Sequence, residues 1–282
     1  MHLVRLWVGF AWDAFQAFIR DDGWAIASHI ALSMLMSLFP FLIFVTALTG
    51  YFGSQDLADQ VAALLLEAWP VEVAGPISAE IASVLTNSHS GLLTIGVLLA
   101  IYFSSSSIES LRIGLNRAYN QMELRPWWLL RLESIGYVLV GAAALIALSF
   151  LILFWPVLFR TAQRYLPAQM PLEDTYTYLR FTIASVILVS ALVLVHKWLP
   201  AGRRRLRDIA PGIVVTLVLW LFVGVLFGRY LAEFAGTYVT MYAGLATAMV
   251  ALVFLYWTAS IFVYGGELNA VIRSARERDK KG

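Results

Sequence analysis

Six stretches of this chain are long, apolar and almost free of charge, and they constrain the fold more than any other feature. An α-helix needs about 20 mostly apolar residues to cross ~30 Å of hydrocarbon. We therefore predict an all-α integral membrane bundle of six transmembrane helices that forms a single domain over residues 1–282. The predicted spans cover residues 30–52, 91–107, 135–159, 178–198, 209–228 and 243–264.

The composition agrees with a membrane protein and excludes several other classes. Apolar residues make up 60% of the chain and charged residues 13%, against about 45–50% and about 25% in soluble domains. Cysteine is absent from the sequence, which rules out disulfides, thiolate metal sites and a cysteine nucleophile. The net charge of +2 is too small to indicate a nucleic-acid partner by itself.

The positive charges divide the connections into two sides. Of the 20 Lys and Arg residues, all but Arg160, Arg164, Arg180 and Arg229 lie before the first span or near the connections after the second, fourth and sixth. The connection between the first and second spans carries acidic residues but no Lys or Arg. Because Lys and Arg are retained in cytoplasmic loops, we predict that both termini are cytoplasmic.

Three segments outside the spans have their own character. Residues 1–27 place Trp7, Phe10, Ala14 and Phe18 on one helical face, which predicts an amphipathic helix lying in the membrane interface. Residues 53–90 form an acidic outer loop in which two amphipathic stretches predict a short helical cap. Residues 268–282 form a basic cytoplasmic tail.

Polar side chains recur at spacings of three and four in the first, second and sixth spans, all in the half nearest the cytoplasm. Because polar groups are costly in hydrocarbon, we predict that these stripes line one polar vestibule open to the cytosol, with Pro40 and Gly265–Gly266 as flexible points. We also expect contacts with lipid headgroups from Arg203, Arg204 and Arg205. The residues predicted to line the substrate pathway are Ser33, Ser37, Pro40, Ser105, Glu109, Asn116, Ser260, Glu267 and Asn269.

Each of these features also has a simpler interpretation. Serines in membrane helices often bond to the carbonyl four residues earlier or to a neighbouring helix, and Pro40 is then a tolerated kink. Glu109 and Glu267 lie near span ends, where a carboxylate is reached by water, and Arg112 is one turn from Glu109 and could pair with it. The arginine run from 203 to 205 could serve topology alone.

The sequence shows no pattern typical of an enzyme. The histidines His2, His29, His89 and His196 are scattered, and none forms a spaced pair with another ligand. Phosphate-binding loops, nucleophile elbows and dinucleotide fingerprints are absent from the sequence. We therefore predict no catalytic residues, no metal and no cofactor, and no specific nucleic acid as partner.

Several longer motifs lie in and between the spans: SLFPFLIFVTALTGYFG around Pro40, GLLTIGVLLAIYFSSSSIESLRIGLNRAYN from residue 91, WLPAGRRRLRDIAPGIVVTLVLW from residue 198 and YAGLATAMVALVFLYWTASIFVYGGELNAV near the end. These motifs resemble the YihY/BrkB family of bacterial inner-membrane proteins. The resemblance implies a six-span helical protein of the cell inner membrane with both termini inside. The family has also carried a tRNA-processing ribonuclease label and a link to virulence, and a role in handling envelope lipids is an expectation for it.

Together, these patterns favour a protein that transports or hands over an amphiphilic envelope substrate such as a phospholipid, with membrane lipids as its partners. One alternative is a scaffold that does not transport and docks an envelope protein through the acidic outer loop. A further alternative is a tRNA-processing ribonuclease.

Overall fold

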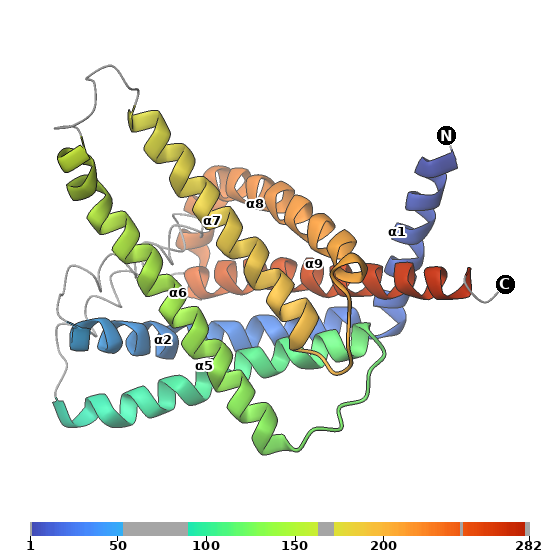
Figure 1. The fold of residues 1–282 in the computed structure, drawn as a ribbon, viewed down its shortest axis with the longest axis horizontal. Coiled ribbons are helices and arrows are strands. Elements are labelled where there is room, and N and C mark those ends of the chain that lie inside the picture. The colour runs from blue at the N-terminus through green and yellow to red at the C-terminus, as the bar shows by residue number, and fades with distance from the viewer. Residues whose placement is uncertain (1, 53–89, 163–171, 243–244, 280–282) are drawn as a thin grey trace.

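The computed structural model describes residues 2–52, 90–162, 172–242 and 245–279, and every regular element in these ranges is an α-helix (Figure 1). The predicted all-α class is therefore confirmed for the described residues. Residues 53–89, which make up all but the last residue of the predicted outer loop 53–90, lie outside them. The helices are α1 (His2–Arg20), α2 (Gly23–Phe52), α5 (Ser90–Ala118), α6 (Trp127–Ala162), α7 (Leu172–Trp198), α8 (Leu206–Tyr242) and α9 (Leu245–Arg278).

Three of the helices contain segments that are long and apolar enough to cross a membrane. These segments are Trp127–Ile146 in α6, Leu206–Glu233 in α8 and Ala248–Arg278 in α9. Shorter apolar segments, Gly23–Leu38 and Thr182–Trp198, lie in α2 and α7. Length and composition thus support a membrane protein, and the number of six spans stays a prediction.

The ends of α5 and α8 follow from local sequence. After α5, Asn120 adopts a positive φ of 49°, which asparagine tolerates better than most residues. The amides of Gln121 and Asn120 then donate to the carbonyls of Asn116 and Arg117 at 2.8 and 2.9 Å, which is a Schellman ending. At the start of α8, the Asp208 carboxylate accepts a hydrogen bond from the Arg205 amide at 3.3 Å, as in one half of a capping box.

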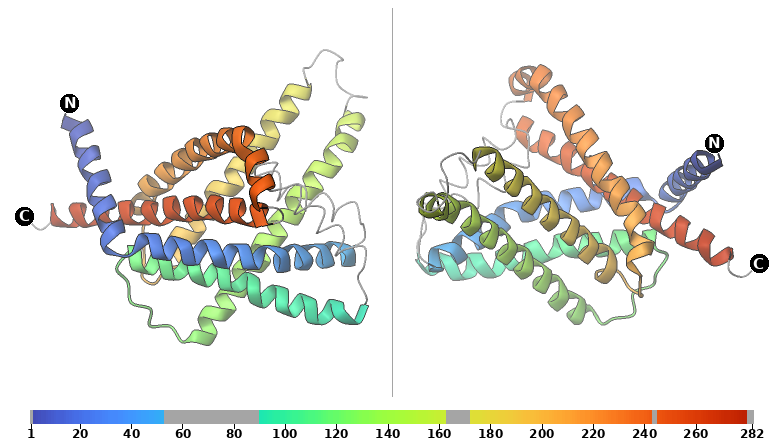
Figure 2. Two further views of the ribbon diagram at one scale, coloured as in Figure 1. Left: turned by 180° about the vertical axis from the view of Figure 1, so that it is seen from behind. Right: turned by 45° about the horizontal axis from the view of Figure 1, so that its top comes forward.

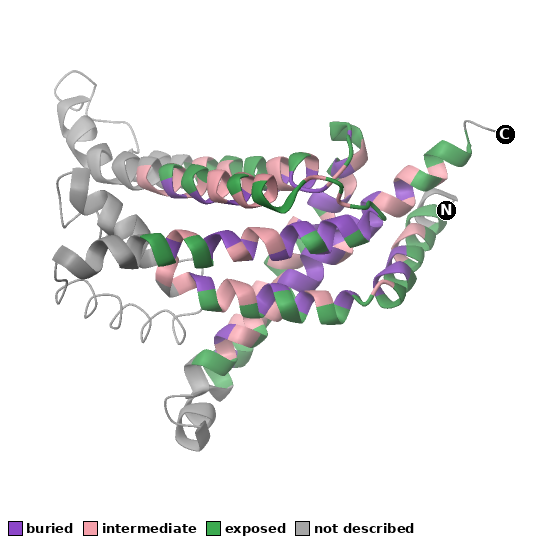
Figure 3. Ribbon diagram, turned by 90° about the horizontal axis from the view of Figure 1, so that it is seen from below, coloured by how far each residue is buried: buried purple, intermediate pink, exposed green. Residues whose placement is uncertain are grey.

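Helices α2, α5 and α9 run side by side and form the centre of the molecule, with α2 in contact with both of the others (Figures 1 and 2). Helix α6 packs on α5, α8 packs on α9, and α7 packs on α8. Both termini lie at the same end of the molecule. Buried residues gather toward that end (Figure 3), where Ile30, Leu115, Leu199, Ile209 and Phe262 belong to the main apolar core.

Helix α1 crosses α9 (Figure 2), and its predicted apolar face is divided between two environments. Ala14 packs with Leu268 and Ile272 of α9, and Phe18 is also buried, whereas Trp7 is 48% exposed. The packed part of the face thus meets protein, and the placement of this helix in a membrane interface stays a prediction.

The residues expected to give flexibility lie inside continuous helices. Helix α2 runs through Pro40 without a break, and α9 runs through Gly265–Gly266. A Cβ at Gly212 of α8 would overlap the carbonyl oxygen of Gly265, and a Cβ at Gly265 would overlap the Thr216 hydroxyl. Gly212 and Gly265 therefore allow α8 and α9 to approach closely.

Candidate functional site

Serines connect α2 to α5 in what we call the α2–α5 serine contact: Ser33, Ser37, Ser107 and Ser110. The hydroxyl oxygens of Ser37 and Ser107 are 2.6 Å apart, and Ser107 donates to the Ser33 carbonyl at 2.8 Å. Ser110 donates to the Ser33 hydroxyl at 2.8 Å. Two predicted pathway residues, Ser33 and Ser37, therefore join neighbouring helices, as the simpler interpretation allowed.

Two more predicted pathway serines bond within their own helices. The Ser105 hydroxyl donates to the Tyr102 carbonyl at 2.7 Å, and the Ser260 hydroxyl donates to the Tyr256 carbonyl at 2.8 Å. Both serines are buried. Their hydrogen bonds satisfy the hydroxyl protons without a ligand.

Glu109 pairs with a residue of the next helix. Arg131 of α6 reaches the Glu109 carboxylate at 2.8 Å and stacks over the Tyr102 ring at 4.0 Å. Arg112, which the sequence suggested as a partner of Glu109, instead donates to the Ser134 hydroxyl at 3.0 Å. Its nearest carboxylate in an ion pair is Glu133, at 3.6 Å.

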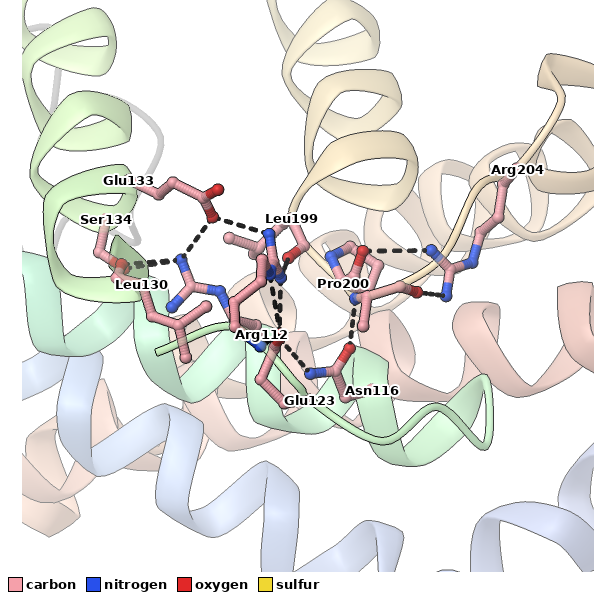
Figure 4. Close-up of polar contacts among 11 residues, drawn as sticks. Arg112, Asn116, Glu123, Leu130, Glu133, Ser134, Leu199, Pro200 and Arg204 are labelled. Carbon is pink, nitrogen blue, oxygen red and sulfur yellow. Dashed lines mark hydrogen bonds and ion pairs between the residues drawn. The ribbon is translucent and has the colours of Figure 1, made fainter. Parts of the chain in front are cut away.

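Asn116 connects the end of α5 to two loops (Figure 4). Its side-chain oxygen accepts from the Ala201 amide at 2.7 Å, and its amide nitrogen donates to Glu123 at 3.1 Å. Arg125 donates to both oxygens of Glu123, at 2.8 and 2.7 Å, and to the Leu199 carbonyl at 3.1 Å. These bonds join the α5–α6 connection to the α7–α8 connection.

The ionisation of this group is shifted by its contacts. The hydrogen bond from Arg125 is the main reason why the pKa of Glu123 falls from 4.5 to about 2. The same bond raises the pKa of Arg125 above its ordinary value. Both groups are therefore charged over the physiological range.

Asn269 takes part in a second buried chain of hydrogen bonds. Its side-chain oxygen accepts from the Gly212 amide at 2.7 Å, and its nitrogen donates to the Tyr119 hydroxyl at 3.2 Å. That hydroxyl forms a hydrogen bond of 2.9 Å with Nδ1 of His196. Burial raises the pKa of Tyr119 to about 12, which keeps its proton in place.

Arg204 lies against the same tyrosine. Its guanidinium stacks over the Tyr119 ring at 4.0 Å and donates to the carbonyls of Pro200 and Ala201 at 3.4 and 2.7 Å. Burial lowers its pKa from the usual value of 12.5. Together with the two groups above, it forms what we call the loop-end cluster: Asn116, Tyr119, Glu123, Arg125, His196, Arg204 and Asn269.

A pocket of about 620 Å³ opens beside the loop-end cluster, and its lining includes Arg203 and Arg204. Arg205 is exposed and is not part of that lining. None of the nine predicted pathway residues lines it. The pocket lining thus contains two of the three predicted headgroup arginines and none of the predicted pathway residues.

Glu267 differs from the other predicted residues because one oxygen of its carboxyl group is buried without a hydrogen-bond partner among the described residues. The side chain is 2% exposed, and its Oε1 atom has no hydrogen-bond partner among the described residues. Of the nine predicted pathway residues, Ser33 and Ser37 thus belong to the α2–α5 serine contact and Asn116 and Asn269 to the loop-end cluster, and Glu267 belongs to neither. The polar vestibule open to the cytosol stays a prediction.

Sequence reasoning missed Tyr119, Glu123, Arg125 and His196 as members of a polar cluster. Tyr119 lies three residues after Asn116, so the helical stripe of the second span could have been extended to it. The contacts of Arg125 with Leu199 and of Tyr119 with His196 join segments that are 74 and 77 residues apart. No local spacing reports such pairs.

Comparisons with known proteins give a family match over most of the chain. A family model described as "Virulence factor BrkB" matches residues 14–282. A protein of Bacillus subtilis (strain 168), described as "Putative ribonuclease-like protein YfkH", is 24% identical over 270 residues, which cover 96% of this chain and 97% of the relative. No solved structure matches.

Proposed function

This chain belongs to the virulence factor BrkB family, and we propose that it is an inner-membrane protein. We propose further that it transports or hands over an amphiphilic envelope substrate such as a phospholipid. We further propose six spans with both termini in the cytoplasm. The helices support this number, because each predicted apolar stretch lies wholly or mostly within one helix of its own: α2, α5, α6, α7, α8 or α9.

The observation that carries the proposal is a set of buried polar atoms without hydrogen-bond partners among the described residues. A buried polar atom without a partner is costly, and native proteins contain few of them. A hydrated path or a passing polar headgroup would give these atoms partners. The atoms are Ser104 Oγ, Arg112 Nε, His196 Nε2, Arg204 Nε, Thr216 Oγ1 and Glu267 Oε1.

A substitution of Glu267 gives the most direct test of this proposal. The chain offers a matched control in Glu277, which lies on the same helix α9 but is exposed and pairs with Arg273 at 2.9 Å. Glu267→Gln keeps the shape of the side chain and replaces a buried carboxyl group to which no cation of the described residues is bonded. If the carboxylate is needed for passage, the variant loses transport although its stability is unchanged or raised.

The experiment reconstitutes the full chain in liposomes that contain a fluorescently labelled phospholipid and follows its movement between leaflets. We expect movement with the wild type, a rate about tenfold lower for Glu267→Gln, equivalent to about 1.4 kcal/mol, and a normal rate for Glu277→Gln. Thermal unfolding in detergent shows whether Glu267→Gln is folded. Absence of movement with the wild type would reject transport and favour a scaffold for an envelope partner.

The description of the Bacillus relative as ribonuclease-like motivates a second candidate function, that of a ribonuclease. Within the described residues, no three His, Asp or Glu side chains gather where they could hold a metal ion. The test is incubation of the purified chain with tRNA and Mg²⁺. Cleavage that elutes together with the protein through successive chromatographic steps would replace the transport proposal.

A further inference from the structure

The pocket beside the loop-end cluster has walls from two connections that are distant in sequence. Residues 121–125 come from the α5–α6 connection, and residues 200–204 come from the α7–α8 connection. Lys197 and Trp198, at the end of α7, complete the lining. The volume of about 620 Å³ is within the range of small-molecule sites.

The walls of this pocket are held by specific bonds. Asn116 accepts from the Ala201 amide at 2.7 Å, and Arg125 donates to the Leu199 carbonyl at 3.1 Å. Gly202 has a φ of +88°, and a Cβ there would lie 2.8 Å from the side-chain oxygen of Gln121. The two connections are therefore fixed against each other before any ligand arrives, which lowers the cost of binding.

The lining carries an excess of positive charge. Arg125 is matched by Glu123 and by Glu133 at 2.7 and 2.8 Å. In the part of the chain that the structure describes, no carboxylate pairs with Lys197, Arg203 or Arg204. The excess favours an anionic ligand.

Arg204 supplies a further sign of an unfilled site. Its side chain is 6% exposed, and its hydrogen bonds go to the carbonyls of Pro200 and Ala201. Its Nε atom is buried and has no hydrogen-bond partner among the described residues. Arginine keeps its charge in proteins, and no carboxylate of the described residues pairs with this guanidinium.

The edge of the pocket is apolar and exposed. Met122 and Leu124 are 84% and 87% exposed, and Trp198 is 56% exposed. Apolar and aromatic side chains next to basic groups are typical of the boundary between membrane and water. A soluble anion would need the positive charge but not this edge, whereas a lipid uses both.

We propose that this pocket binds the phosphate-bearing headgroup of an anionic membrane lipid. Lys197, Arg203 and Arg204 supply the positive charge, and Met122, Leu124 and Trp198 lie against the less polar part of the lipid. This proposal rests on the proposed function and deepens it, because it names the chemical class of amphiphile that the protein takes.

The test measures binding of phosphatidylglycerol to the full chain in detergent by native mass spectrometry, with phosphatidylcholine as the comparison lipid. The test variant combines Lys197→Gln with Arg203→Gln and leaves Arg204, which holds the loop carbonyls. The control variant combines Arg5→Gln with Arg278→Gln; it removes the same charge from exposed residues outside the pocket lining.

We expect the test variant to bind phosphatidylglycerol about tenfold more weakly and the control variant to bind it within about twofold of the wild type. A variant with Lys197→Arg and Arg203→Lys keeps both charges and should retain binding, which separates charge from folding. Equal binding by the test and control variants would overturn the proposal. Binding of inorganic phosphate that is lost in the test variant, without any preference of the wild type for phosphatidylglycerol over phosphatidylcholine, would overturn the lipid assignment in favour of free phosphate.

The outcomes of this test and of the transport test are separable. Selective binding of phosphatidylglycerol by a protein that moves no lipid would reject transport and keep the pocket. Transport that continues normally while the test and control variants bind equally would reject the pocket and keep transport.

Discussion

The loop-end cluster and the α2–α5 serine contact are both polar, but they hold the molecule together in different ways. In the serine contact, hydroxyls bridge two helices whose backbone groups are already paired, and Ser37 has a second acceptor in the Met34 carbonyl at 3.0 Å. In the loop-end cluster, side chains bond to backbone groups outside helices, such as the Ala201 amide and the Leu199 carbonyl. If the side chain is removed, these backbone groups have no hydrogen-bond partner within a helix to replace it.

The difference predicts where a substitution is costly. Loss of a serine hydroxyl leaves a contact that the helices can repack, and hydrogen bonds between membrane helices average about 0.6 kcal/mol. Loss of a loop-end contact leaves a buried backbone or charged group unpaired, which costs about 1–3 kcal/mol or more. The loop-end cluster should therefore dominate the stability of the bundle.

The largest expected effect is at Gly212, whose amide is bonded to Asn269 of the cluster. A Cβ at this position would overlap the backbone oxygen of Gly265 and would lie 2.6 Å from the Asn269 side-chain carbon. Gly212→Ala must therefore separate α8 from α9, and we expect a loss of about 3 kcal/mol or more in the free energy of unfolding. Thermal unfolding in detergent measures it.

Gly224 provides the matched control on the same helix. A Cβ there would meet no described atom within 4 Å, so Gly224→Ala should be neutral or stabilise the helix by about 0.5–1 kcal/mol. Equal effects of Gly212→Ala and Gly224→Ala would contradict the close approach of α8 and α9 at the loop end.

The second-largest expected effect is the loss of stability when the Glu123 carboxylate is replaced, and this effect depends on pH. Because the folded pKa of Glu123 is about 2, below its ordinary value of 4.5, its contribution to stability is complete above pH 4.5 and is lost as the pH falls toward 2. We expect Glu123→Gln to reduce the free energy of unfolding by about 1–2 kcal/mol near neutral pH, a value discounted for the partial exposure of the carboxylate. The difference from the wild type should shrink as the pH falls through this window.

Unfolding curves at a series of pH values test this, with Glu277→Gln as the control. Glu277 is an exposed carboxylate that pairs with Arg273 on the same helix, so its replacement should change stability little at any pH. A difference between wild type and Glu123→Gln that is independent of pH would mean that the carboxylate charge does not hold the two connections together.

The helical fold was predictable because its signal is local. Long apolar stretches specify helices wherever they occur, and the described helices contain all or most of the stretches that the sequence indicated. The pairing of Ser33 and Ser37 with another helix was also available as an alternative, since small hydroxyl side chains at a spacing of four favour helix contacts. Which helix they would meet was not predictable from that spacing.

The loop-end cluster was not predictable, because its contacts join segments that are distant in the sequence. Its charged members lie in connections, where the sequence pattern identifies Arg and Lys as signals of orientation and says nothing about their partners. Arg112 illustrates the problem: one turn from Glu109 along the helix, it turns to Ser134 of α6, while Arg131 of α6 takes Glu109. The spacing in the sequence predicts that Arg112 and Glu109 pair within one helix. In the folded protein, each of them instead bonds to a residue of the neighbouring helix.

The smallest expected effect is at the serine contact itself. Ser37→Ala removes a hydroxyl 2.6 Å from that of Ser107, but Ser107 keeps its bond to the Ser33 carbonyl at 2.8 Å, so no donor is left unpaired. We expect a loss of about 0.5 kcal/mol, measured by thermal unfolding beside Ser28→Ala, which removes an exposed hydroxyl bonded within α2 and should cost nothing measurable. A loss at Ser37 as large as that at Gly212 would show that the centre of the bundle depends on α2–α5 hydroxyls as much as on its loop end, and the contrast between the two regions would fail.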